Sequence, residues 1–331
     1  MSTSTEAISP TPRMTLRLGG NMVPLVIVVC SLVAYVIAAL VTGQTAQLSL
    51  DGFVGILQRT VALGLVALGQ TLVILVRSID LSVATLVSVG AVMASWIMQG
   101  DPAMMIPACL FVLAISAAVG LLNGLIVTQL MVNPLIATLG IGLVLQGILS
   151  ASFQDFAGSV PKDFQIFAYG MVGPLTISII LLFVLAVLEW LMLSRTRFGA
   201  HIYATGGNAD GARLAGIKTQ RVTILAHMLG SLAAGITGLY LASRLRSGAP
   251  WVGRDGVYDL ESIAVVVIGG TILAGGKGGV WGTIAGVILF GCLDAIFSML
   301  GVDAYIKQVL RGAIVIVAVA AYAYRFKGHV A

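Results

Sequence analysis

Long apolar segments follow one another along almost the whole chain, separated by short polar breaks. A helix that crosses a lipid bilayer needs about 20 mainly apolar residues, and the segment 23–41 meets that requirement. Soluble domains carry about a quarter charged residues, whereas this chain has only 9% and is 59% hydrophobic. The sequence therefore predicts an all-α polytopic membrane protein and excludes a soluble globular domain.

The apolar segments predict about ten membrane spans. They lie at residues 23–41, 60–76, 82–99, 104–129, 134–152, 169–193, 222–243, 262–273, 278–298 and 305–324. The eighth is short and ends in Gly-Gly-Thr, so a continuous helix and a broken one both stay open. We expect one transmembrane domain at 21–325, a flexible tail at 1–20 and a short tail at 326–331. The first run is too long for a signal-peptide core and lacks a cleavage site, so we expect it to be retained.

The charges between the spans predict the orientation. Cytoplasmic loops are enriched in Lys and Arg, and ten spans with the N-terminus inside place most Lys and Arg in cytoplasmic segments and most acids in external ones. Asp80 is among the few acids expected on the cytoplasmic side, and Arg59 is expected outside. This topology predicts that both termini are cytoplasmic.

A weak internal repeat relates the two halves. The segment 79–90 aligns without gaps on 258–269, so that Asp80 matches Asp259. In the predicted topology these two residues lie on opposite sides of the membrane, which makes the repeat inverted. Inverted repeats form a pathway near the bilayer midplane in many transporters.

The longest polar break, at 194–221, predicts a short capped helix on the cytoplasmic side. Asn208 is a suitable N-cap and Gly216 lies where a C-cap glycine belongs, so 209–215 is expected to form about two helical turns. Ala212, Leu214 and Ala215 would form a small apolar surface. We expect a cytosolic partner to bind here; a basic loop that only fixes topology is the alternative.

No enzyme site is apparent. His201, His227 and His329 are far apart and have no carboxylate or cysteine at catalytic or metal-ligand spacing. The three cysteines lie in apolar runs and indicate neither disulfides nor metal. The glycine-rich segment 269–278 departs from a Walker A motif at two required positions, so we expect no nucleotide or other cofactor on this chain. Active transport would need an ATPase subunit in a separate chain.

Uncharged polar residues inside the spans are the candidates for a solute pathway, because polar groups in lipid usually face a cavity or a partner. They are Gln70 and Thr71 in 60–76, Asn123 in 104–129, and Thr138, Gly142 and Gln146 in 134–152. The last three share one helix face. Amides and hydroxyls without fixed charge suit a neutral polyhydroxylated solute. Hydrogen bonding between helices is the alternative.

Asp294 and Arg311 are charged residues within the last two spans, at similar depth from the same side. They predict a structural ion pair, with a solute site as the alternative.

The polar break also carries a resemblance. RTRFGxxxYAxGGNxxxARLxGI at 195–217 resembles the signature of the permease subunits of ribose-type ABC sugar importers. Further similar motifs are IDLSV at 79–83, NGLIV at 123–127, NPLIATLG at 133–140, VVIGGT at 266–271 and GGxGGVWGTIAG at 275–286. The similarity covers roughly residues 50–325.

The resemblance implies a bacterial inner-membrane permease that works as a homodimer or a related heterodimer. An ATP-hydrolysing subunit would dock on the loop through Gly207, Asn208, Ala212, Arg213, Leu214, Ala215 and Gly216, and a periplasmic binding protein would deliver a monosaccharide. The chain departs from the family pattern at Arg77-Ser78, Ala84, Gln146 and Asp294. These positions lie on or near the predicted pathway, so the identity of the sugar stays open.

Two other transport functions remain as alternatives. An ABC permease for another polar solute, such as a branched-chain amino acid, would need charged or helix-end partners for a zwitterion. An ion-coupled secondary transporter would need a coupling acid near the midplane, and the sequence indicates none there. A purely structural role would leave the capped cytoplasmic helix unexplained.

Overall fold

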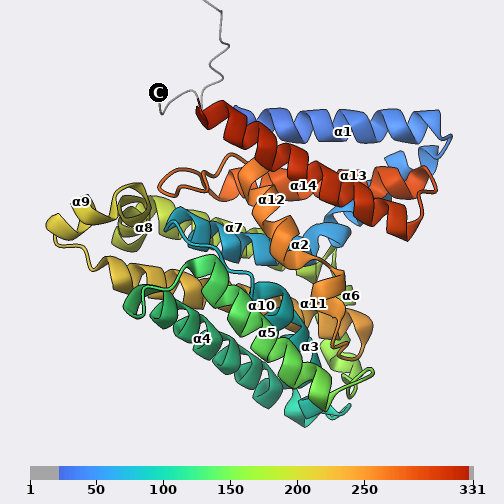
Figure 1. Ribbon diagram of the computed structural model, residues 1–331. Helices are drawn as coiled ribbons and strands as arrows, with labels where there is room; N and C mark the ends of the chain where they lie inside the picture. The colour runs from blue at the N-terminus through green and yellow to red at the C-terminus, as the bar shows by residue number, and fades with distance from the viewer. Residues whose placement is uncertain (1–21, 328–331) are drawn as a thin grey trace, which may run out of the picture.

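The computed structural model describes residues 22–327, and a helix lies at each of the ten places where the sequence predicts a span (Figure 1). These helices are α1 (Val23–Val41), α2 (Leu50–Leu75), α3 (Val83–Met98), α4 (Met105–Gln129), α5 (Pro134–Ser152), α7 (Ile177–Arg195), α10 (Thr219–Leu245), α12 (Tyr258–Ile268), α13 (Val280–Met299) and α14 (Ala304–Lys327). The expected tail at 1–20 lies outside the described residues. Of the expected tail at 326–331, residues 326 and 327 belong to α14 and the others lie outside the described residues, so this tail stays a prediction.

Shorter elements connect these helices. They are η1 (Thr45–Leu48), η2 (Pro102–Met104), η3 (Lys162–Gln165), α6 (Ile166–Tyr169), β1 (Met171–Val172), β2 (Leu175–Thr176), α8 (Arg197–Gly207), α9 (Ala209–Leu214) and α11 (Val252–Asp255). The two strands form an antiparallel hairpin in which Met171 pairs with Thr176.

Seven helices of the described chain are long and apolar enough to cross a membrane, which makes the chain an all-α polytopic membrane protein apart from the small hairpin. They are α1, α2, α4 with η2, α5, α7, α10 and α13. Helix α3 is apolar but has only 16 residues, and α12 has 11, which is about 16 Å of helix. The number of crossings stays a prediction.

Two of the predicted span boundaries are wrong. Helix α2 begins about ten residues earlier than expected, because Ser49 caps it by accepting a hydrogen bond from the Gly52 N–H at 3.3 Å. Arg59 therefore lies within α2 and not in a loop. Helix α7 begins at Ile177 and not at 169, because Gly170 and the Gly173-Pro174 turn break the apolar run into α6 and the hairpin.

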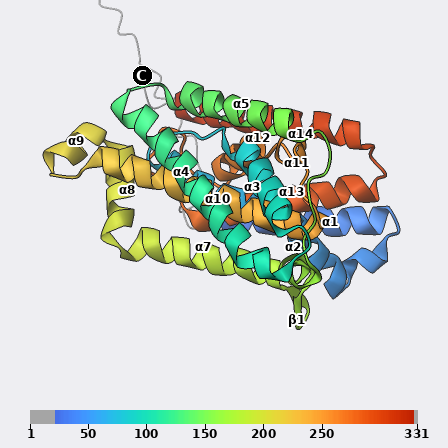
Figure 2. The ribbon, with the colours of Figure 1, turned by 90° about the horizontal axis from the view of Figure 1, so that it is seen from below.

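Helices α2 and α10 form the centre of the bundle. Helix α10 packs against α2, α3 and α4, whereas α2 packs against α12 and α13. Figure 2 shows α10 in the middle, with α7 along one side and α5 along the other. The two central helices approach closely where they cross, since a Cβ added to Gly69 would lie 2.8 Å from the Gly230 carbonyl oxygen.

Each half of the chain packs its central helix against helices of the other half, which is the pattern that an inverted repeat would produce. The central helix of the first half packs on α12 and α13, and the central helix of the second half packs on α3 and α4. The repeat itself stays a prediction.

Candidate functional site

The short helix predicted in the polar break is present as α9 and projects from one end of the bundle (Figure 1). Asn208 caps its start by accepting a hydrogen bond from the Gly211 N–H at 2.9 Å. At its end Gly216 has a left-handed φ of 84°, and the Ile217 N–H donates to the Ala212 carbonyl at 3.0 Å. These are the geometries that N-caps and Schellman C-caps adopt, so the predicted helix is confirmed to within one residue.

The exposed surface of α9 differs from the expected one. Leu214 is 91% exposed and Ala215 is also exposed, but Ala212 is only 6% exposed. Helix α9 packs on α8 and α10, so one of its faces is covered, and Ala212 lies on that face. The prediction that Ala212 belongs to the apolar surface is therefore wrong, and Leu214 is its main member.

Arg213 is held by its neighbours rather than free to search for a partner. Its Nε donates to the Thr219 hydroxyl at 3.2 Å, and its Nη1 lies 3.7 Å from a carboxylate oxygen of Asp210. The start of α10 and the first turn of α9 are thus joined by one side chain. The remaining predicted contact residues, Gly207 and Asn208, are exposed.

Helix α8 precedes α9 and was not predicted from the sequence. Thr196 caps it by accepting a hydrogen bond from the Gly199 N–H at 3.2 Å, and Ile202 is fully buried. The Thr-x-x-Gly cap followed by an apolar residue is the local signal that could have indicated it. The projecting surface is consequently a two-helix unit, α8–α9, and not a loop with one helix.

The end of α8 is packed against the glycine-rich segment 269–279. A Cβ on Gly206 would overlap the Leu75 carbonyl oxygen and lie 2.6 Å from the Gly276 nitrogen. The Gly276 N–H donates to the same Leu75 carbonyl at 3.0 Å, and the Tyr203 hydroxyl donates to the Gly278 carbonyl at 3.0 Å. The glycine-rich segment therefore serves as a packing joint between α8, the end of α2 and the start of α13.

The Tyr203 hydroxyl at this joint stays protonated and can therefore donate a hydrogen bond. Burial, and secondarily the charge of Glu189, raise the pKa of the Tyr203 phenol above its ordinary value. A phenol with a raised pKa stays protonated at neutral pH and donates to a carbonyl. Displacement of α8–α9 would thus act directly on the ends of α2 and α13.

Three of the predicted pathway residues converge on one buried segment, 78–82, which joins α2 to α3. With its amide oriented so that both of its polar atoms are bonded, Gln70 donates to the Asp80 carbonyl and accepts from the Asp80 N–H, each at 3.3 Å. The Thr138 hydroxyl accepts from the Leu81 N–H at 3.0 Å. The Asn123 amide donates to the Ser82 hydroxyl at 2.8 Å. All three side chains are fully buried.

Asp80 is at the centre of this network, together with a histidine. Its carboxylate accepts hydrogen bonds from the backbone and hydroxyl of Ser82, at 2.9 and 2.6 Å. His227 lies with Nδ1 3.6 Å from the other carboxylate oxygen and with Nε2 2.8 Å from the Ser78 hydroxyl. Both Asp80 and His227 have no exposed surface.

One expectation from the sequence is corrected here, and one residue has an environment that the sequence did not indicate. Asp80, which is expected on the cytoplasmic side, is a buried carboxylate, because the segment 78–82 folds back between helices. His227 does have a carboxylate neighbour, although 147 positions separate the two residues (227 minus 80). Sequence spacing could not reveal a pair that only the packing of α10 on α3 and α4 creates.

The remaining pathway candidates lie around the same network. The Thr71 and Thr283 hydroxyls are hydrogen bonded at 2.7 Å. Gly142 faces the start of α3, since a Cβ there would lie 3.4 Å from Cα of Ser82. Gln146 is half-buried and donates to the Ser150 hydroxyl at 2.9 Å. Hydrogen bonding between helices accounts for the contacts of the fully buried members, and solute contact stays a prediction.

A cluster of four charged side chains joins α2, α12, α13 and α14. It lies toward the end of α2 that is distant from α9. Arg311 lies 2.6 Å from Asp294, as the predicted pair requires, and also 3.2 Å from Glu261. Arg59 lies 3.1 Å from the other oxygen of Asp294. The sequence indicated the pair between α13 and α14 but missed Arg59 and Glu261, because both had been assigned to loops or span ends. That the cluster is structural rather than a solute site stays a prediction.

Comparison with known proteins places this architecture in a family. The profile of the family described as "Branched-chain amino acid transport system / permease component" matches residues 52–319. No solved structure matches the chain.

Several characterised permeases are similar over most of their length. The ribose import permease protein RbsC of Escherichia coli K12 is 35% identical over 277 residues, which cover 82% of this chain and 85% of RbsC. RbsC of Bacillus subtilis 168 is 36% identical over 270 residues, or 80% of this chain and 82% of that protein. The galactose/methyl galactoside import permease protein MglC of Haemophilus influenzae is 33% identical over 292 residues, or 82% of this chain and 86% of MglC. The chain therefore belongs to this family of transport-system permease components.

Proposed function

We propose that this chain is the membrane-spanning permease subunit of a bacterial ABC importer for a sugar. The observation that carries the proposal is the similarity, at 32–36% identity over most of both chains, to import permeases for ribose and galactose. The family description alone also covers branched-chain amino acids, but the similar proteins named here are sugar permeases. A pentose or hexose is accordingly the first class of solute to test.

The α8–α9 unit supports the proposal that a separate ATPase subunit binds this chain and hydrolyses the ATP. It presents Leu214, at 91% exposure, at the tip of a helix that is capped at both ends. The glycine-rich segment 269–279 makes packing contacts with α8 and α2, which supports a role in helix packing rather than in phosphate binding. In this proposal the ATPase binds α8–α9 in the cytosol and uses the ATP, and this chain binds no cofactor.

The remaining partners follow from the same proposal. A second permease copy, identical or related, would complete the path across the inner membrane, and a periplasmic binding protein would deliver the sugar. Helix α5 is our choice for the solute path, because Gln146 is half-buried and its amide oxygen has no hydrogen-bond partner among the described residues. The termini would be cytoplasmic, on the same side as α9.

Affinity purification of the chain from its native membrane tests the proposal. We expect an ATP-hydrolysing subunit to co-purify in stoichiometric amount, and the complex with its binding protein to take up a sugar when ATP is supplied. Uptake of branched-chain amino acids instead of sugars would support the assignment as an ABC permease but contradict the proposed solute. Solute accumulation by the isolated chain under an ion gradient would refute the ABC mechanism.

A further inference from the structure

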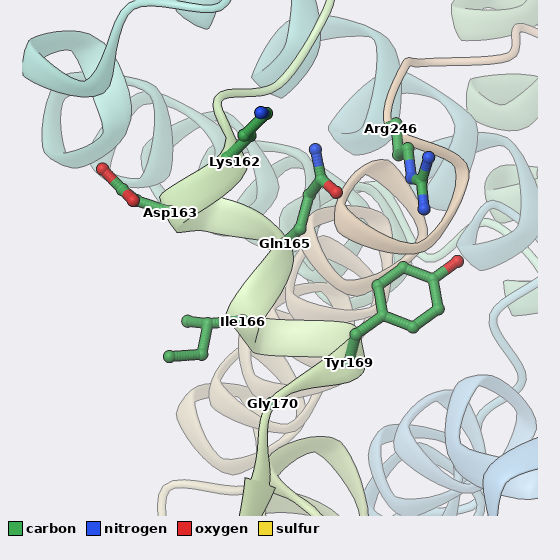
Figure 3. Close-up of a pocket in the computed structure, with 7 residues that line it drawn as sticks. All are labelled: Lys162, Asp163, Gln165, Ile166, Tyr169, Gly170 and Arg246. Carbon is green, nitrogen blue, oxygen red and sulfur yellow. The ribbon is translucent and has the colours of Figure 1, made fainter.

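A cleft with two unneutralised cations lies at the end of the bundle opposite α9. Its volume is about 460 Å³, and Figure 3 shows the residues that line it. They are Lys162, Asp163, Gln165, Ile166, Tyr169, Gly170 and Arg246. Helix α10 starts beside α9 and ends next to Arg246, and its 27 residues correspond to about 40 Å of helix. The cleft is thus separated from α8–α9 by the full depth of the bundle.

The cations of the cleft have no acidic partner in the described chain. Neither Lys162 nor Arg246 has a carboxylate oxygen within 4.0 Å among residues 22–327. In Figure 3 the side chains of Lys162, Gln165 and Arg246 gather on one side of the η3–α6 segment, and the Asp163 carboxylate points to the other side. The cleft therefore offers positive charge and amide hydrogen bonds to an anion.

Arg246 is held in place before any ligand arrives. Its guanidinium lies 5.8 Å from the centre of the Tyr169 ring, as in a cation–π contact. The Tyr169 hydroxyl in turn donates to the Arg244 backbone carbonyl at 2.7 Å, which fixes the ring. A guanidinium positioned in this way can donate two parallel hydrogen bonds to a phosphate.

Helix α6 and the strand β1 that follows it carry exposed apolar side chains, and Figure 3 shows the Ile166 side chain pointing away from the two cations. Ile166 is 61% exposed, Met171 58%, Val172 59% and Tyr169 51%. The Ile177 N–H at the start of α7 donates to the Gly170 carbonyl at 2.8 Å, and Arg246 follows the last residue of α10. The cleft therefore lies where two membrane-length helices reach the bilayer surface, and at that depth Tyr, Lys and Arg contact head groups while apolar side chains contact acyl chains.

We infer that this cleft binds the phosphate of an anionic phospholipid. Lys162 and Arg246 contact the phosphate, Gln165 hydrogen bonds to the head group, and the apolar side chains of α6 and β1 contact the acyl chains. A free phosphate ion would use the same cations but not the apolar side chains. An acidic side chain of a soluble partner would likewise not use side chains that face lipid.

The test measures lipid retained by the full-length protein. The protein is reconstituted into nanodiscs of phosphatidylcholine with and without phosphatidylglycerol, and bound phosphatidylglycerol is counted by native mass spectrometry. We expect the double variant K162Q/R246Q to bind phosphatidylglycerol roughly 25-fold more weakly, at about fivefold per lost cation. R254Q is the matched control, because Arg254 is an exposed arginine at the same end that already contacts Asp255 at 3.7 Å. Unchanged retention in the double variant would overturn the inference.

Two further arms separate the possible sources of the anion. If M171S/V172S weakens phosphatidylglycerol binding as well, the apolar contacts belong to the site and a lipid is supported. Equal thermal protection of the detergent-solubilised protein by inorganic phosphate, lost in K162Q/R246Q, would assign the cleft to a free ion and overturn the lipid. Loss of binding-protein affinity in phosphatidylcholine nanodiscs, with lipid retention intact, would assign it to a protein carboxylate. None of these readouts depends on sugar transport, so failure here is distinguishable from failure of the proposed function.

Discussion

The α8–α9 unit and the buried network around Asp80 are both polar features of an apolar chain, but they are built in opposite ways. Helix α9 is defined by contacts over a few residues, such as that of Asn208 with Gly211. The network joins residues from α2, α4, α5 and α10 that lie up to 157 positions apart (227 minus 70). The first has an exposed side chain that the proposed function assigns to a partner, and the second consists of buried hydrogen bonds between helices. The comparison teaches that exposure and local capping indicate docking, whereas buried long-range pairing indicates structure.

The comparison predicts that the network controls stability. Asp80→Ala removes the partner of His227 and leaves the Ser82 hydroxyl without its acceptor, while the Asn123 amide loses only a contact at 3.5 Å. A buried polar group left without its hydrogen-bond partner typically costs about 1–3 kcal/mol, and this variant affects several such groups at once, so we expect a large fall in the thermal midpoint of the purified protein. Asp210→Ala is the control, because the Asp210 side chain is 90% exposed. Equal stability of the two variants would contradict the structural role.

The packing joint is expected to have an intermediate effect. In Gly206→Ala the new methyl group would overlap the Leu75 carbonyl, and overpacking of this kind costs about 1–3 kcal/mol. Gly207→Ala is the matched control, because a Cβ there meets nothing within 4 Å. Thermal unfolding should separate the two neighbouring variants. If both glycines tolerate alanine, the joint is looser than the structure shows.

Loss of the α9 cap should have a smaller effect on stability. Asn208→Ala removes the acceptor for the Gly211 N–H, which typically costs about 1 kcal/mol. Asn208→Ser restores a capping hydroxyl and serves as the control. We expect faster hydrogen exchange confined to residues 209–214 in the alanine variant. Exchange that rises equally throughout α10 would show that α9 is not a locally defined unit.

The smallest effect on stability should accompany a large effect on transport. Leu214→Glu places a charge on a side chain that is already 91% exposed, so the free energy of unfolding should change by no more than about 0.5 kcal/mol. ATPase binding and sugar uptake should nevertheless be lost, because the apolar contact surface would carry a charge. Normal uptake by this variant would remove α9 from the docking surface.

The sequence predicted those features that depend on local composition and capping. The bounds of α1 and α5 agree with the predicted spans to the residue, because each lies between clear polar or proline signals. The caps of α9 were likewise recognisable. Its covered face was not, because burial of Ala212 depends on how α9 packs against α8 and α10.

The features that the sequence could not predict depend on tertiary packing. The hydropathy pattern placed 169–176 in a span, because short apolar strands and apolar helices have similar composition. In the structure Gly173 and Pro174 form a turn there. Asp80 and His227 were not paired, since nothing local indicates that 78–82 folds back between helices. Glu261 and Arg59 were missed because the sequence analysis placed both outside the spans, although both contact the predicted pair.

The charged cluster on α2, α12, α13 and α14 also has a consequence for the order of synthesis. Helix α14 is synthesised after α2, α12 and α13, and it carries Arg311. Until it inserts, Asp294 can pair with Arg59, but Glu261 has no other cation within 4.0 Å among the described residues. Without α14, the Glu261 carboxylate, which is only 5% exposed in the folded chain, has no cationic partner within the described part of the chain. Insertion of α14 brings Arg311 to both Glu261 and Asp294, so packing of this helix and charge compensation within the cluster occur in one step.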